Sequence, residues 1–429
     1  MLVTDPIDAA YAKLNTFTDI VWQRADSSGD VLHVVAALSV RKSLGLIVFD
    51  FDRSNDNGPK MVQKYKTEYG IAANRIVYAD CRAMKVEDVL KKAKSTGDLL
   101  HKKYVFLVNT TNIVAKEKKL PKELKELLRG PKAATIDDLV EATDEELFDF
   151  WIAKKMKFDQ PAVILWGRTS GKDRGVDGPH PYGDSSATGI SQIAAKCVQK
   201  GWSVVLAGDI AETKFRDGRF PGCVYLGKFW GDTFWKGESA NKIRTQPRQL
   251  RLFYVLKKIL KYASCRLVHV GMRSGGLDAY AFSGQSIIYL VPAGVDDQRI
   301  QFLAKKFKKN WIPSNPAQPP KRAFTRNWDP DWLNAVAHDR DWLNLLSSSP
   351  QFLTEKARLK EFYPTDIDTQ IHAKLAYQTV KKMLAEVKPA DMPALLESLC
   401  IQEQKQRGFS GEYLEKLLAQ IDGALSRAF

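Results

Sequence analysis

The chain has 429 residues, 44% of them hydrophobic and 27% charged, with a formal net charge of +15. This composition excludes a disordered or fibrous protein, and the length predicts two or three domains. No apolar run approaches the roughly 18 residues of a membrane span, no signal peptide is evident, and the five cysteines lack zinc-site spacing, so we expect a cytoplasmic protein.

The first 115 residues alternate apolar runs of strand length with runs of helical periodicity. Because the strands are apolar on both faces, they predict a parallel sheet covered by helices on both sides. The expected strands are residues 19–24, 44–50, 75–79 and 104–109, and the expected helices are residues 31–38, 59–69 and 86–94.

Residues 116–160 are highly charged and are predicted to form linker helices. The strand–helix alternation then restarts and predicts a second α/β unit over residues 161–312, facing the first across a cleft. Its expected strands are residues 162–166, 203–207, 223–226, 267–270 and 286–291, and its expected helices are residues 189–200 and 248–262.

Residues 313–429 begin with a proline-rich crossover and continue as a helical C-terminal segment. We expect these helices to return and brace the N-terminal unit.

The sequence SSGDVLHVVAAL, residues 27–38, follows a predicted strand and opens a helix. Ser28 or Asp30 is expected near the helix N-cap. A helix N-terminus beside a strand end is also where α/β proteins bind ligands. Asp30 is therefore either a helix cap or a cleft residue that takes part in chemistry.

The sequence GMRSGG, residues 271–276, joins a predicted strand to a predicted helix. Its glycines allow the backbone to approach a phosphate, and the helix N-terminus attracts negative charge. Arg273 would complete a phosphate clamp with Ser274, Gly275 and Gly276. A structural turn is the alternative.

The loop after the first strand of the second unit is rich in glycine and carries Arg168, Lys172 and Arg174. These cations would offset the charge of a departing diphosphate without a metal ion. No Asp-x-Asp motif stands in a suitable place for a metal, because residues 50–52 end a strand of the first unit. Asp209 ends another strand of the second unit, where an acid either contacts a nucleotide or is an ordinary strand-end residue.

The Asp30 loop resembles the N-terminal motif of the lipopolysaccharide heptosyltransferases, and the Gly-rich loop resembles the donor site of GT-B glycosyltransferases. The first resemblance implies that Asp30 is the base that deprotonates the acceptor hydroxyl. It also implies that Ser27, Ser28 and Gly29 shape the loop on the acceptor side, with His33 one turn into the helix. Lys172 is the nearest match to the basic residue that contacts the donor phosphates. The chain departs from that family after residue 272, where the family has Asp-Thr-Gly and then a histidine.

These resemblances, with a looser one to O-fucosyltransferase-like enzymes, imply a GT-B glycosyltransferase with two Rossmann-like domains facing a cleft. Residues 1–115 would bind the acceptor and residues 161–312 the nucleotide-sugar donor, with Asp209 and Asp278 contacting its nucleotide or sugar. Sugar transfer from a nucleotide-diphosphate sugar would be inverting and metal-independent, with no cofactor beyond this co-substrate.

Two other function classes remain open. The net charge favours an anionic partner, and residues 299–328 hold eight Lys and Arg residues and no acid. A nucleic-acid-binding protein, or a glycosyltransferase with an anionic acceptor such as nucleic acid or a phosphorylated glycan, would explain this stretch. A solvated basic face is the more ordinary explanation of such a charge run. A sugar-nucleotide epimerase of the same fold is the other alternative.

Overall fold

The structure is a computed structural model of the 429-residue chain. It describes residues 5–25, 27–51, 57–105, 107–116, 122–129, 145–168, 185, 187–208, 222–227, 229–230, 246–272, 275–283, 285–290, 311–314 and 411–426.

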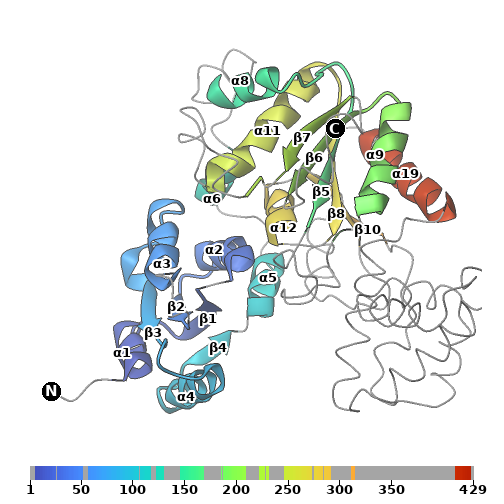
Figure 1. The fold of residues 1–429 in the computed structure, drawn as a ribbon. Helices are drawn as coiled ribbons and strands as arrows, with labels where there is room; N and C mark the ends of the chain where they lie inside the picture. Colours follow the sequence, from blue (N-terminus) through green and yellow to red (C-terminus); the bar gives the residue numbers. More distant parts are fainter. Residues whose placement is uncertain are drawn as a thin grey trace, which may run out of the picture.

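The first half of the chain forms a four-stranded parallel sheet in the order β3-β2-β1-β4 (Figure 1). Nearly every residue of β1 and β2 is buried, as their continuous apolar sequence predicts. The order changes direction between β1 and β4, which makes this the topological switch point of the sheet. The strands are β1 (Asp19–Arg24), β2 (Leu44–Asp50), β3 (Ile76–Asp80) and β4 (Lys103–Val105).

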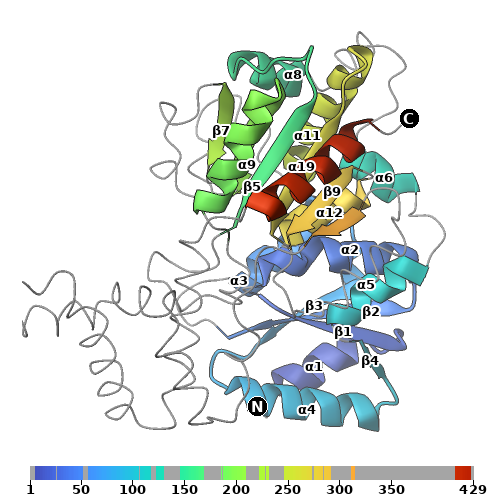
Figure 2. The ribbon, with the colours of Figure 1, turned by 90° about the vertical axis from the view of Figure 1, so that its right-hand side faces the viewer.

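Helices cover both faces of this first sheet, which confirms the predicted α/β layering. One face carries α1 (Pro6–Lys13) and α4 (Val86–Leu99) (Figure 2). The other carries α2 (Val31–Val40), α3 (Asn57–Thr67) and α5 (Leu107–Lys116). Two short 3-10 turns, η1 (Ser28–Asp30) and η2 (Ala73–Arg75), precede α2 and β3.

The strand predicted over residues 104–109 is wrong in its second part, because β4 ends at Val105 and α5 begins at Leu107. A short apolar run suits a buried helix as well as a strand. The tertiary contacts of α5 decide between the two, since its Thr110, Thr111 and Val114 are buried and the helix packs against α2.

The second half forms a six-stranded parallel sheet in the order β10-β9-β8-β5-β6-β7. Taken from β7 to β10, the strand order is that of a doubly wound sheet, with its switch point between β5 and β8. The edge strand β10 was not predicted; it contains Pro313, a residue tolerated at sheet edges. The strands are β5 (Ala162–Gly167), β6 (Ser203–Gly208), β7 (Cys223–Gly227), β8 (Leu267–Met272), β9 (Ser286–Leu290) and β10 (Trp311–Ser314).

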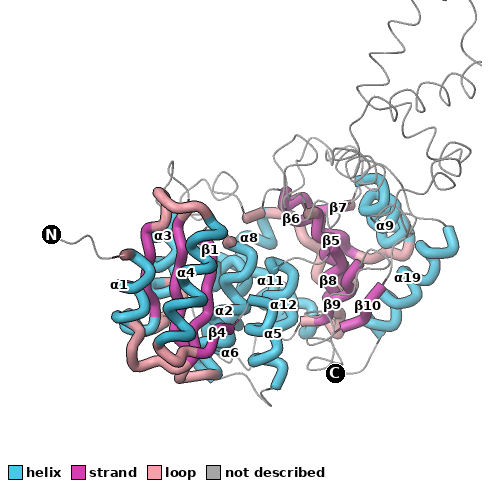
Figure 3. Tube along the Cα trace, turned by 90° about the horizontal axis from the view of Figure 1, so that it is seen from below, coloured by secondary structure: helices cyan, strands magenta, loops and turns pink. Residues whose placement is uncertain are grey.

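The helices α11 (Gln246–Tyr262) and α12 (Gly275–Phe282) cover the face of the second sheet that looks toward the first half (Figure 3). Two helices from the predicted linker, α6 (Lys122–Arg129) and α8 (Glu145–Ala153), pack against α11. The opposite face carries α9 (Ala187–Gln199).

The last described helix, α19 (Gly411–Ser426), also packs on the second sheet. Its apolar side chains, among them Leu417 and Ile421, are buried with α9, β8 and β9. The expectation that the C-terminal helices brace the N-terminal unit is therefore wrong for this helix.

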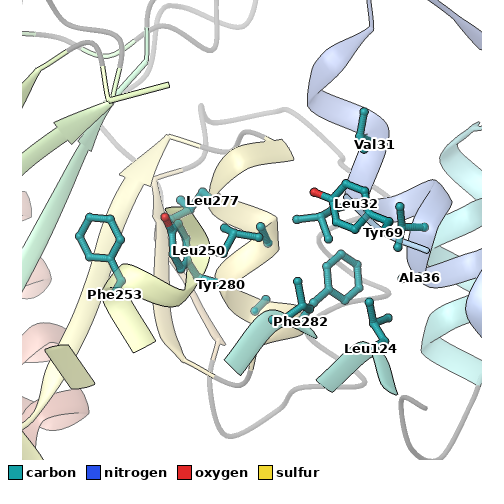
Figure 4. Close-up of a cluster of buried hydrophobic side chains, with 14 of the residues drawn as sticks. Val31, Leu32, Ala36, Tyr69, Leu124, Leu250, Phe253, Leu277, Tyr280 and Phe282 are labelled. Carbon is teal, nitrogen blue, oxygen red and sulfur yellow. The ribbon is translucent and has the colours of Figure 1, made fainter. Parts of the chain in front are cut away.

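The two halves meet through α2 and α12, and one hydrophobic core runs through the junction. Figure 4 shows Phe282 of α12 between the second-half side chains Tyr280 and Phe253 and the α2 side chains Leu32 and Ala36 (Figure 4). Buried apolar contact of this kind is the main source of association between packed layers. The junction therefore sets how the two sheets face each other.

Candidate functional site

The three loops singled out in the sequence all leave strands that border a switch point. The Asp30 loop follows β1 in the first sheet, and the other two follow β5 and β8, which are neighbours in the second. Trp166 of β5 lies opposite Gly271 of β8, so the two basic loops begin side by side. The crevice outside the strand ends at a switch point is the usual ligand site of an open α/β sheet.

The loop after β5 is tied together at its base. The Arg168 backbone N–H donates to Ser185 Oγ at 2.9 Å, and the Ser185 N–H donates to the Arg168 carbonyl at 2.9 Å. These two bonds hold the ends of the loop at the switch point. Lys172 and Arg174 lie between them, outside the described residues.

The Gly-rich loop ends where α12 begins, at Gly275 and Gly276. A β-carbon on Gly276 would lie 3.2 Å from the Trp230 indole, so the ring covers this part of the helix N-terminus. The sequence predicted that glycine lets the backbone approach a phosphate. In the structure, Gly276 lets the backbone approach the Trp230 ring. Arg273, Ser274 and Asp209 lie outside the described residues.

A buried network fixes the loop that carries Asp30. Tyr65 of α3 donates a hydrogen bond to Gln23 Oε1 of β1, and both side chains are buried. The Gln23 amide then donates to the Ser27 carbonyl at 2.9 Å. Ser27 Oγ in turn donates to Asp30 Oδ2 at 3.2 Å. The chain of contacts thus runs from the sheet interior to the Asp30 carboxylate.

Asp30 occupies the N-cap position of α2, but its side chain makes no capping hydrogen bond to the helix. Asp30 is partly exposed, and its negative charge acts on the Tyr65 hydroxyl. Burial, and after it the negative charge of Asp30, raise the pKa of the Tyr65 hydroxyl well above its usual value. The capping interpretation therefore lacks its hydrogen bond.

The structure brings the Asp30 loop and the Gly-rich helix together. Residues of η1 and of α2 both contact α12 across the junction between the halves. Of the predicted site residues, Ser28, Gly29 and Asp30 belong to η1 and His33 belongs to α2, the two elements that contact the helix beginning at Gly275.

His33 and Asp278 form a buried pair across this junction. His33 Nε2 lies 2.8 Å from Asp278 Oδ2, and both residues are fully shielded from solvent. His33 Nδ1 lies 2.8 Å from Thr111 Oγ1, and the Tyr289 hydroxyl donates to Asp278 Oδ1 at 2.5 Å. Both carboxylate oxygens thus have protein partners, which disfavours the predicted contact between Asp278 and a nucleotide or sugar.

Sequence reasoning gave no role to Thr111, Tyr289, Gln23 or Tyr65. Thr111 lies in α5, 78 residues along the chain from His33, and Tyr289 lies in β9, 11 residues from Asp278. Gln23 and Tyr65 carried one signal, since a polar residue inside an apolar strand and a tyrosine on an apolar helix face both need a buried partner.

The first acid of the Asp-x-Asp stretch has a structural role in the first half. Asp50, in the Asp-x-Asp stretch, accepts a 2.9 Å hydrogen bond from the Gly58 N–H and so supports the start of α3. Within the described part of the chain, no three His, Cys, Asp or Glu side chains gather as a metal site. The helices described there include none with the length and apolar character of a membrane span.

Comparison with known proteins gives little more. No family model and no curated protein matches the chain. Among solved structures, the glycosyl transferase family 9 structure from Veillonella parvula DSM 2008 is similar with 8% identity and a TM-score of 0.36. The match covers 70% of this chain and 87% of that one. A likeness this weak shows neither family nor activity, so the function must be argued from this chain's own residues.

Proposed function

We propose that the chain is a GT-B glycosyltransferase that moves a sugar from a nucleotide-diphosphate sugar to an acceptor hydroxyl. The observation that carries this proposal is the contact between η1 and α12. It joins an aspartate-bearing loop at one switch point to a Gly-rich helix start at another. An acceptor held by the first half and a diphosphate held by the second would meet at such a place.

Asp30 would act as the general base in a single inverting step. Its carboxylate takes the proton of the acceptor hydroxyl while that oxygen bonds to the anomeric carbon. The bond from that carbon to the diphosphate breaks, and its electron pair leaves on the phosphate oxygen. Ser27 Oγ, 3.2 Å from Asp30 Oδ2, would orient the carboxylate.

The leaving diphosphate needs positive charge and hydrogen-bond donors. Arg168, Lys172, Arg174 and Arg273 would supply the charge, and Ser274, Gly275 and Gly276 would supply donors at the start of α12. These cations would make a metal ion unnecessary. The net charge of +15 favours such an anionic donor and also an anionic acceptor.

Titration calorimetry with UDP, GDP, ADP and CDP tests the proposal directly. We expect one of them to bind in the micromolar to low millimolar range, and its sugar conjugates to release that nucleotide slowly in the presence of the protein. Absence of binding to all four at millimolar concentration would overturn the donor site.

A further inference from the structure

The His33–Asp278 pair is built separately by the two halves and completed only when they meet. Thr111 supports His33 from α5 of the first half, and Tyr289 supports Asp278 from β9 of the second. The bond from His33 Nε2 to Asp278 Oδ2 spans 245 residues of sequence and joins the two halves between α2 and α12. Gln246 of α11 makes a second connection between the halves, through its hydrogen bonds with Tyr69 and Glu68. With Asp278 ionised, both of its oxygens accept hydrogen bonds, and Nε2 would then carry the hydrogen and donate it.

Stability alone does not account for this pair. Burying two polar groups costs about as much in desolvation as their attraction returns, and apolar side chains in their place are often as stable. The surrounding junction is apolar, with Leu32, Ala36 and Phe282 buried beside it, and the Phe282 ring lies 5.1 Å from the His33 ring. An apolar contact tolerates small sliding movements, whereas a buried pair at 2.8 Å is satisfied in one arrangement only.

His33 lies close in sequence to Asp30, and Asp278 lies close in sequence to the Gly-rich start of α12. His33 follows Asp30 by one helical turn and so lies on the same side of α2. Asp278 lies in the first turn of α12, two residues after Gly276. A bond between His33 and Asp278 therefore sets how far Asp30 is from the N-terminus of α12.

We infer that His33 and Asp278 are positioning residues that hold the acceptor base and the donor-binding helix in register. This inference rests on the proposed function for its catalytic meaning, but the register itself is a property of the fold. Neither residue touches the reacting atoms. Their part is to place Asp30, where displacements on the order of 1 Å cost about 10²-fold in rate.

Hydrogen–deuterium exchange of the intact chain tests the register without any ligand. In His33→Leu, and in the milder Asp278→Asn, we expect exchange in α2 and α12 to rise about 10²-fold, while α9 and α19 stay as in the wild type. His33→Gln, which returns an amide N–H donor, should restore much of the protection. Unchanged exchange in α2 and α12 of both His33→Leu and Asp278→Asn would overturn the inference.

Two variants serve as matched controls because each removes a buried hydrogen bond inside one half. Thr111→Val and Tyr289→Phe should lower the melting temperature, yet leave exchange in the helix of the other half near its wild-type value. If they loosen both α2 and α12 as much as His33→Leu does, the pair is ordinary packing and the inference is wrong.

The closing experiment separates nucleotide binding from turnover. In His33→Leu and His33→Gln we expect the wild-type Kd for the nucleoside diphosphate that the wild type binds. Release of that nucleotide from its sugar conjugate should fall at least about tenfold in His33→Leu, with partial recovery in His33→Gln. Equal turnover per folded molecule in all three would overturn the positioning role while nucleotide binding stands. A wild type that binds none of the four nucleoside diphosphates would instead overturn the proposed function, and the exchange data would still decide the register.

Discussion

Trp166 Nε1 donates a 2.9 Å hydrogen bond to His269 Nδ1 inside the second sheet. On the other side of the imidazole ring, His269 Nε2 lies 2.9 Å from Gln285 Oε1 and donates to it. This arrangement fits only the neutral ring, because Nδ1 must keep its lone pair for the indole N–H. Burial, with a smaller effect of the charge of Lys257, lowers the pKa of His269 to about 3.

This histidine makes the folded state sensitive to mild acid. In the unfolded chain a histidine protonates near pH 6.5, whereas His269 stays neutral in the fold until about pH 3. Below pH 6.5 the unfolded state therefore binds the extra proton, and the free energy of unfolding should fall by about 1.4 kcal/mol per pH unit. Urea unfolding at pH 6.5 and 5.0 should show about 2 kcal/mol more loss in the wild type than in His269→Leu. Equal losses in the two proteins would contradict the buried neutral ring.

The strand ends β5 and β6 approach each other too closely for a side chain at Gly208. Its φ is +109°, and a β-carbon there would lie 2.0 Å from the Gly167 carbonyl oxygen. We expect Gly208→Ala to cost more than about 3 kcal/mol, or to prevent folding. Gly201→Ala is the control, because Gly201 has a φ of +76° but open space around its β-carbon. That variant should lose only about 1 kcal/mol in urea unfolding; a comparable loss in both would argue against the close contact.

Two tyrosines near the end of α3 allow the Asp30 network to be tested against a matched control. Tyr65 bonds to Gln23 behind the Asp30 loop, whereas the Tyr69 hydroxyl donates to Gln246 Oε1 of α11 at 2.6 Å. Tyr65→Phe leaves the buried Gln23 oxygen without its donor, and Tyr69→Phe leaves the partly buried Gln246 oxygen without its donor. Each change should cost about 1–3 kcal/mol. Only Tyr65→Phe should also slow nucleotide-sugar turnover, by about tenfold, because it loosens the carboxylate. Turnover that falls equally in Tyr69→Phe would show that the effect is not specific to the Asp30 network.

The layered fold was largely predictable, because the apolar strands and the helices between them have clear periodicity. Residues 19–24 and 44–50 coincide with β1 and β2 to the residue. The errors occur where long-range contacts decide. The helix α5 packs its buried Thr110, Thr111 and Val114 against α2, and α19 packs its buried apolar side chains on the second sheet. The position of the three candidate loops at strand ends was predictable. The His33–Asp278 pair was not, because nothing local in the sequence indicates a partner 245 residues away.

If cations rather than a metal ion stabilise the leaving diphosphate, chelation should leave turnover unchanged. Nucleotide release from the sugar conjugate is compared with and without excess EDTA, and again after addition of Mg²⁺ or Mn²⁺. The charge of Arg168, Lys172, Arg174 and Arg273 would then carry the effect that a divalent ion carries elsewhere. Loss of turnover with EDTA and its recovery with either metal would refute the proposed metal independence.

The sharpest prediction concerns Asp30, whose carboxylate accepts from Ser27 Oγ and makes no capping bond to α2. Asp30→Asn keeps the shape and removes the charge, and asparagine is as good as aspartate at an N-cap position. The melting temperature and the affinity for the nucleoside diphosphate should therefore stay near their wild-type values. If Asp30 is the base, turnover should fall by about 10²–10⁴-fold, because the amide cannot take the proton of the acceptor hydroxyl. Ser27→Ala is the companion variant: it leaves the carboxylate in place without its donor, and its turnover should lie between those of the wild type and Asp30→Asn. An Asp30→Asn protein with wild-type melting temperature and wild-type turnover would show that Asp30 belongs to the helix start alone.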